Sequence, residues 1–309
     1  MVCANAEQES EDVYLLTRMS LSCTIVAVTS LLDEIYVITE NSDTVYVYFC
    51  HRPYELEDSV SIPEMNPADI ATSYTDVCVY ILDSNNVCLW RIYRNLTTKK
   101  YPLDVRPGES LSSMSITRKG VIVVVQTGNS IVMYNPRNGE TKHVPLEGLL
   151  EATGKCIVHA TEIGENRLLA CHDTQMFVIT YDLKLANVCN VMDSGGNHIA
   201  LMNNKCAVVA DKTGRMVRML DIDEWKIKNQ WKLSSERRGT ENPSHVHYSK
   251  ENQLLFFTWL SYLGVYSFDD SDRESYLAAG EIESRQQQES DYTRETADLP
   301  GKLCCIHVC

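Results

Sequence analysis

The sequence of 309 residues lacks any apolar run long enough to cross a membrane, which takes about 18 residues or more. Its first residues, MVCANAEQESED, are polar and acidic, and they lack the apolar segment of a secretory signal. These two absences argue against a membrane partner and against secretion. We therefore expect the protein to be cytoplasmic.

The 12 cysteines include no CxxC pair and no zinc-finger spacing. In a reducing compartment we expect free thiols, which behave as small hydrophobic side chains inside apolar segments. The C-terminal sequence Cys304-Cys-Ile-His-Val-Cys309 holds zinc donors, but adjacent cysteines on an extended strand do not easily reach one ion. We interpret it as a buried or oxidisable strand end.

A basic stripe is also absent. The net charge of −14 is concentrated at the ends, because residues 1–12 carry four acids and no base, and residues 269–299 carry a net of −7. The electrostatic footprint of a nucleic-acid-binding protein is therefore missing. The acidic ends serve solubility or attract a basic protein partner.

The sequence contains no Gly-x-Ser-x-Gly elbow and no glycine-rich phosphate loop followed by a helix. These absences argue against a serine hydrolase and against a nucleotide-dependent enzyme. We expect no bound cofactor.

What the sequence does contain is a repeat of two apolar segments joined by a short polar turn. The first apolar residue after each turn recurs at steps of 40 to 47 residues: Val45, Val87, Ile131, Met176, Met216 and Leu263. The first segment of each pair is a continuous apolar run, as expected for a strand buried on both faces. This period predicts an all-β fold, a single β-propeller with six four-stranded blades, or seven as the alternative.

The repeats divide the chain into four parts. We expect an acidic disordered segment over 1–12, the propeller over 13–282, a polar acidic linker over 283–300 and a ring-closing strand over 301–309. Two short segments, Val13–Arg18 and Lys302–Val308, compete to complete the last blade, or together begin a seventh. The segment 275–282 is a third candidate for the outer strand of the last blade.

The blades resemble those of NHL and WD40-type propellers. Asp83-Ser-Asn-Asn-Val87 follows an apolar strand, as in NHL repeats, and Asn85-Asn-Val-Cys-Leu-Trp90 resembles the tryptophan-bearing third strand of WD40 blades. The Trp-Asp dipeptide and a Gly-His pair before the blades are absent. The resemblance implies an interaction platform that binds a protein or peptide on one rim.

Three histidines and one aspartate share a place in the repeat. His159, His198, His245 and Asp69 precede their anchors by 17 or 18 residues. Equal register on successive inner strands directs side chains to one level of the central channel. These donors suit a transition metal such as zinc, as in propeller lyases and hydrolases of similar type; the alternative is a wet channel lined with polar groups.

We interpret the chain as a non-catalytic scaffold that binds a protein or peptide on one rim of the ring. Trp259 and Tyr262, expected at an exposed turn of the last blade, are candidate partner-binding residues. The alternative function is that of a metal-dependent lyase or hydrolase with its metal in the channel.

Overall fold

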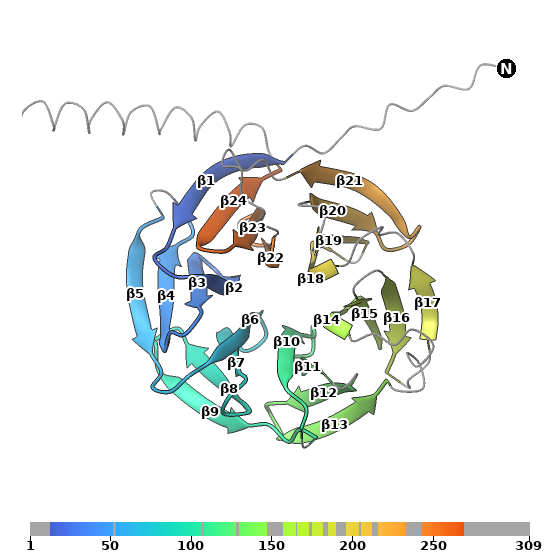
Figure 1. Ribbon diagram of the computed structural model, residues 1–309, viewed down its shortest axis with the longest axis horizontal. Helices are drawn as coiled ribbons and strands as arrows, with labels where there is room; N and C mark the ends of the chain where they lie inside the picture. The colour runs from blue at the N-terminus through green and yellow to red at the C-terminus, as the bar shows by residue number, and fades with distance from the viewer. Residues whose placement is uncertain are drawn as a thin grey trace, which may run out of the picture.

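The computed structural model describes residues 13–268, apart from gaps at 52–53, 107, 128–129, 147–156, 165, 173–174, 182–184, 190–195, 204, 212–215 and 233–242. These residues form six four-stranded antiparallel sheets arranged in a ring around a central channel (Figure 1). The prediction of a six-bladed propeller is therefore confirmed. The described residues form no helix, and so none long and apolar enough to span a membrane.

The strands follow one another outward from the channel in each blade. Blade one contains β2 (Ile25–Leu31), β3 (Glu34–Thr39), β4 (Thr44–Phe49) and β5 (Leu56–Ser61). Blade two contains β6 (Pro67–Ser73), β7 (Cys78–Asp83), β8 (Cys88–Tyr93) and β9 (Thr98–Pro102). Blade three contains β10 (Leu111–Ile116), β11 (Ile122–Gln126), β12 (Ser130–Asn135) and β13 (Glu140–Pro145).

The second half of the ring repeats this order. Blade four contains β14 (Ile157–Glu162), β15 (Arg167–His172), β16 (Met176–Thr180) and β17 (Leu185–Cys189). Blade five contains β18 (Gly196–Leu201), β19 (Cys206–Asp211), β20 (Met216–Asp221) and β21 (Lys226–Lys232). Blade six contains β22 (His245–Ser249), β23 (Leu254–Trp259), β24 (Tyr262–Ser267) and β1 (Tyr14–Ser20).

The last blade is completed by a strand from the beginning of the described chain. β1 pairs antiparallel with β24, with Tyr14 opposite Ser267 and Ser20 opposite Tyr262. The outer place in blade six therefore belongs to β1, which tethers the two ends of the propeller through backbone hydrogen bonds. The other two candidates for that place, 275–282 and 301–309, lie outside the described residues, as do 1–12 and 283–300.

The hydrophobic core lies between neighbouring blades. Every residue of β7, β11, β19 and β23 is buried, because each second strand is covered on both faces by adjacent sheets. In the outermost strands, exposed residues alternate with less exposed ones, as in β13, or nearly all residues are exposed, as in β9. This gradient reproduces the rise in polarity that the sequence pattern predicts from the channel outward.

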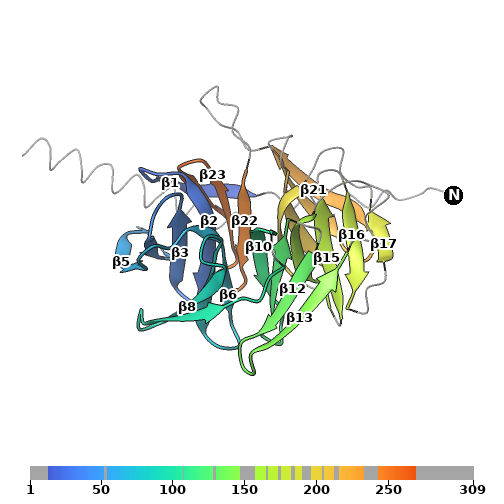
Figure 2. The same ribbon diagram turned by 60° about the horizontal axis from the view of Figure 1, so that its bottom comes forward.

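The turns divide the ring into two faces, because the four strands of a blade are antiparallel and run through its thickness (Figure 2). We call the face with the turns after β2, β6, β10, β14, β18 and β22 the proximal face. The opposite face, with the turns between second and third strands, is the distal face.

Candidate functional site

The inner strands are joined to one another around the channel. Four of the six joints carry hydrogen bonds that involve side chains: Thr29 with Thr72 (2.8 Å), Asp69 with Met114 (2.7 Å), Ser113 with Val158 (2.7 Å) and Ser30 with His247 (3.1 Å). At the other two joints, β14–β18 and β18–β22, imidazole rings pack against each other. The channel wall thus contains hydrogen-bonded joints in one part and packed imidazole rings in another.

A repeated β-bulge places three of the candidate channel residues, Asp69, His159 and His198, at one level. The pairing of first and second strands shifts by one residue immediately before Asp69, Ser113, His159 and His198. A bulge redirects the side chain that follows it. Because the bulge recurs at the same place, residues that lie at the same distance from their anchors in sequence occupy equivalent positions in successive blades.

The carboxylate of Asp69 lies at the centre of this level and is 2% exposed. The backbone N–H of Ile70 donates to Oδ1 at 2.8 Å, and that of Met114 donates to Oδ2 at 2.7 Å. His245 Nε2 lies 3.2 Å from Oδ1, and His198 Nε2 lies 3.8 Å from Oδ2. Since an ionised carboxylate only accepts hydrogen bonds, His245 carries its proton on Nε2 in this arrangement.

The rings of the three histidines pack against one another in a row, here called the histidine stack, and are tilted by 45° and 36° between neighbours. The ring centroids of His159 and His198 are 3.9 Å apart, and those of His198 and His245 are 3.7 Å apart. Both ring nitrogens of His159 and of His198, and Nδ1 of His245, are buried without a hydrogen-bond partner among the described residues. Buried polar atoms of this kind are costly, on the order of 1–3 kcal/mol each, and they call for a water molecule or an ion.

Burial controls the protonation of this cluster. Burial and the neighbouring His245 lower the pKa of His198 to about 4, and burial followed by His198 lowers the pKa of His159 well below its usual range. Burial alone would raise the pKa of Asp69, but the contacts of its carboxylate with His198 and His245 outweigh burial and hold that pKa below its usual range. Near neutral pH, Asp69 is therefore ionised while His159 and His198 are neutral.

A cavity of about 580 Å³ opens around the channel on the proximal face. Its lining combines apolar and charged side chains from five blades, among them Tyr74, Ile116, Arg118, Glu162, Met202 and Lys250. We call it the mouth cavity. A smaller cavity of about 150 Å³, lined by His159, His198 and His245, shares several wall residues with it, so the histidine stack is reached from the proximal face.

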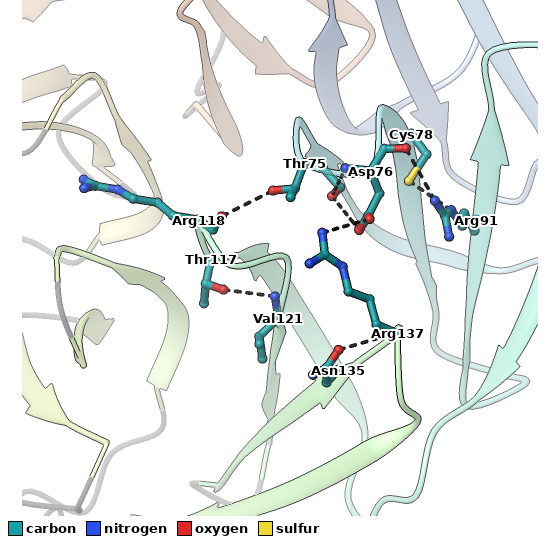
Figure 3. Close-up of polar contacts among 10 residues, drawn as sticks. Thr75, Asp76, Cys78, Arg91, Thr117, Arg118, Val121, Asn135 and Arg137 are labelled. Carbon is teal, nitrogen blue, oxygen red and sulfur yellow. Dashed lines mark hydrogen bonds and ion pairs between the residues drawn. The ribbon is translucent and has the colours of Figure 1, made fainter.

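The turns around the mouth cavity are fixed by contacts between blades. Thr75 Oγ1 donates to the backbone oxygen of Arg118 at 3.3 Å, and Arg137 Nη2 lies 3.2 Å from Asp76 Oδ1 (Figure 3). The backbone N–H of Arg118 donates to Oε2 of Glu162 at 2.8 Å. In Figure 3 the side chain of Arg118 extends away from the Asp76–Arg137 pair, and it lines the cavity.

The structure corrects one expectation about the aromatic residues of blade six. Trp259 is 9% exposed and therefore buried, not displayed at a turn. Its ring lies over Gly264, where an added Cβ would be 2.9 Å from Trp259 Cη2. Tyr262 is partly exposed and packs on Trp259 with ring centroids 6.0 Å apart, and Arg18 Cζ lies over the Tyr262 ring, 5.1 Å from its centroid. Both residues belong to the distal side of the blade, away from the mouth cavity.

The residues that line the mouth cavity were not predicted from the sequence. Tyr74, Arg118, Glu162 and Lys250 follow or end inner strands, but their residue types differ from blade to blade. The position after each inner strand was the signal that could have found them, because these turns necessarily surround the channel on one face. The predicted channel residues, by contrast, do come together: Asp69, His198 and His245 meet, and His159 stacks on His198.

Comparison with known proteins identifies the fold and no family. No family model matches the sequence, and no curated protein matches it. Among solved structures, a streptogramin B lyase is similar with a TM-score of 0.59 at 13% identity, covering 82% of this chain and 97% of that one. The WD40 β-propeller domain of Doa1 has a TM-score of 0.59 at 10% identity, covering 84% and 98%.

Raptor from Chaetomium thermophilum is also similar, with a TM-score of 0.59 at 10% identity, and the match covers 82% of this chain but 29% of Raptor. At such low identity these likenesses show the propeller fold alone. They confirm the resemblance to propellers of the WD40 kind and include both an enzyme and a propeller domain of a larger protein. Fold therefore does not decide between catalysis and binding here.

Proposed function

We propose that this propeller is a non-catalytic platform that binds a protein or peptide segment at the mouth cavity. The observation that carries the proposal is a cavity of about 580 Å³ on the proximal face, built from turns that hydrogen bonds hold in place between blades. A rigid frame that presents varied loop residues is the usual basis of recognition by such folds. Binding to a preformed cavity also avoids the entropic cost of ordering loops.

The chemistry of the lining favours a particular kind of segment. Tyr74, Ile116 and Met202 offer apolar contact, whereas the exposed side chains of Arg118 and Lys250 add positive charge. Glu162 is buried and accepts hydrogen bonds from the Arg118 backbone and the Tyr181 hydroxyl, so its charge is directed inward. A segment with an apolar side chain flanked by acidic residues fits this lining best.

This preference differs from the basic partner suggested by the acidic ends of the chain. That expectation concerns residues 1–12 and 269–299, which lie outside the described residues, and it stays a prediction for those segments. From composition alone, we also propose that the protein is cytoplasmic and that its partners are neither nucleic acids nor membranes.

The arrangement of the channel favours binding over the lyase or hydrolase alternative. Asp69 is hydrogen-bonded to two backbone amides and to His245, and the histidine rings pack against each other. A substrate would have to displace one of these rings to reach the carboxylate. The larger free volume lies outside this cluster, at the mouth.

The test is a selection of peptides from a displayed library against the intact chain, followed by measurement of affinity by fluorescence anisotropy. Tyr74→Ala and Arg118→Glu are each expected to weaken binding by about ten-fold or more, roughly 1.4 kcal/mol. The matched control is Leu260→Ala on the distal face, since Leu260 is 50% exposed and Tyr74 is 43% exposed. Equal affinity in the mouth variants and the wild type, or an equal loss in Leu260→Ala, contradicts the proposal.

A further inference from the structure

Three donor atoms converge at one level of the channel. An oxygen of Asp69 and one ring nitrogen each of His198 and His245 lie within 4.8 Å of one another. Two of the separations are 3.2 Å, from His245 Nε2 to Asp69 Oδ1, and 3.8 Å, from His198 Nε2 to Asp69 Oδ2. Donor atoms at about 2.1 Å from a tetrahedral zinc ion lie about 3.4 Å apart. The 3.2 Å separation is close to this value, and the 3.8 Å separation, which is measured to the other carboxylate oxygen, exceeds it by about 0.4 Å.

The surroundings of Asp69 suit a metal ligand. Its two oxygens are oriented by the backbone N–H groups of Ile70 and Met114, at 2.8 and 2.7 Å. Hydrogen bonds of this kind hold a ligating carboxylate in one orientation and leave its remaining lone pairs directed at the ion. The carboxylate is also buried, so its negative charge is poorly compensated by solvent.

The histidines supply an independent observation. Nε2 of His198 is buried and lies 3.8 Å from Asp69 Oδ2, yet it has no hydrogen-bond partner among the described residues. Without an ion, this nitrogen stays unsatisfied. An ion bound to Nε2 gives it a partner, and the adjoining cavity of about 150 Å³ has room for a water molecule on that ion.

We propose that Asp69, His198 and His245 bind one divalent transition-metal ion, with zinc as the best fit to this donor set. Zinc takes the place of the proton on His245 Nε2, which is released to solvent, and two imidazoles and a carboxylate leave the fourth tetrahedral position for water. The ion stabilises the ring by linking β6 of blade two to β18 and β22 of blades five and six. It bridges one of the two joints where imidazoles pack together, β18–β22, and the connected mouth cavity gives it access.

The ion has a structural role in this proposal, and the site is separate from the peptide-binding residues of the mouth. The two hypotheses can therefore fail independently. A chain that binds peptides but no metal contradicts only the channel site, and a chain that binds zinc but no peptide contradicts only the proposed platform.

The first experiment uses the full chain without a histidine tag, stripped of metal with a chelator and then titrated with zinc against a chromophoric competitor. We expect uptake of one zinc ion per chain. Since loss of an outer-shell partner alone weakens metal binding about 10- to 100-fold, His198→Gln and His245→Gln are each expected to weaken it about 100-fold or more. The matched control is His143→Gln, an imidazole on β13 beside Asp104, and it should bind zinc as the wild type does.

Two measurements on the unmodified protein avoid any dependence on how the variants fold. Cobalt(II) bound at the proposed site should give the visible spectrum of a tetrahedral ion, without a thiolate-to-cobalt charge-transfer band. Zinc at about 100 times its dissociation constant should raise the midpoint of thermal unfolding by several degrees.

The cysteines provide the main competing site. A variant with Cys304, Cys305 and Cys309 changed to serine is expected to retain the zinc and the cobalt spectrum. Failure to take up zinc overturns the proposal. So does zinc binding that both channel variants retain, or a cobalt spectrum with a thiolate band that the serine variant abolishes.

Discussion

The indole nitrogen of Trp90 donates a hydrogen bond to the carboxylate of Asp83, 3.1 Å away, between neighbouring strands of blade two. Blade five uses the same two positions with a different donor, since Arg218 Nη2 lies 3.2 Å from Asp211 Oδ2. In each blade the carboxylate ends the second strand and its partner follows on the third. One position in the blade thus accepts either a neutral or a charged donor, and the charged version is the more costly to disrupt.

Asp211→Ala is expected to lower the free energy of unfolding by about 3–5 kcal/mol, because it leaves a buried guanidinium without its carboxylate. Arg218 is 7% exposed, so water cannot replace the lost partner. Urea unfolding followed by circular dichroism measures the change. Asp211→Ala/Arg218→Met should recover at least half of the loss.

The control is Arg137→Met, which removes a pair whose arginine is 54% exposed and should cost about 1 kcal/mol or less. A double variant no more stable than Asp211→Ala contradicts this account.

Val77→Gly is expected to stabilise the protein by about 0.5–1 kcal/mol. Val77 has a φ of 47°, in the left-handed region that costs a side chain roughly 1–2 kcal/mol, and the entropy of glycine in the unfolded chain offsets part of the gain. Val77 is 44% exposed, so little packing is lost. Val188→Gly is the matched control, because Val188 is 40% exposed and lies within β17. It should destabilise the protein, and stabilisation by both substitutions would show that φ is not the cause.

The register of the blades could be predicted from the sequence because a local pattern determines it. Asp69 and His198 were placed at one level by their distance from the following turn. The structure preserves that distance through a bulge that recurs in the same place. Each blade is a local unit, so an offset counted within one blade transfers to the next. The six-bladed ring follows from the same repetition.

The proximal cavity and the burial of Trp259 could not be predicted in this way. Arg118 and Lys250 occupy corresponding turns but share no pattern with the other blades, and only the closed ring brings them around one opening. Trp259 was expected at an exposed turn, yet its ring is covered because Gly264 leaves space beside it. Both features depend on contacts between strands, which a periodic pattern does not encode.

Gly264→Ala is expected to destabilise the protein by about 1–3 kcal/mol through overpacking. An added Cβ would lie 2.6 Å from Tyr266 Cε2 and 2.9 Å from Trp259 Cζ3, so both rings would have to move. Urea unfolding measures the loss. It is followed by circular dichroism, so that variants with and without Trp259 are compared by the same signal. The loss of stability caused by Gly264→Ala should be smaller in a Trp259→Phe background than in the wild type, because the smaller phenylalanine ring leaves space for the methyl group. An equal loss in both backgrounds would show that the tryptophan ring is not what excludes the methyl group.

The thiols of Cys23 and Cys50 are expected to differ widely in reactivity. Cys23 is exposed, whereas Cys50 is buried, and burial together with the nearby carboxylates of Asp33 and Glu251 raises the pKa of Cys50 to about 12. Its thiolate fraction at about pH 8 is then on the order of 10⁻⁴, and the thiolate is the reactive species. Brief treatment of the native chain with N-ethylmaleimide, followed by peptide mass spectrometry, should modify Cys23 well before Cys50. In denaturant the two should react at similar rates, since the difference comes from the fold. Rapid modification of Cys50 in the native chain would mean that the contact between blades six and one opens readily, and would contradict the closed ring.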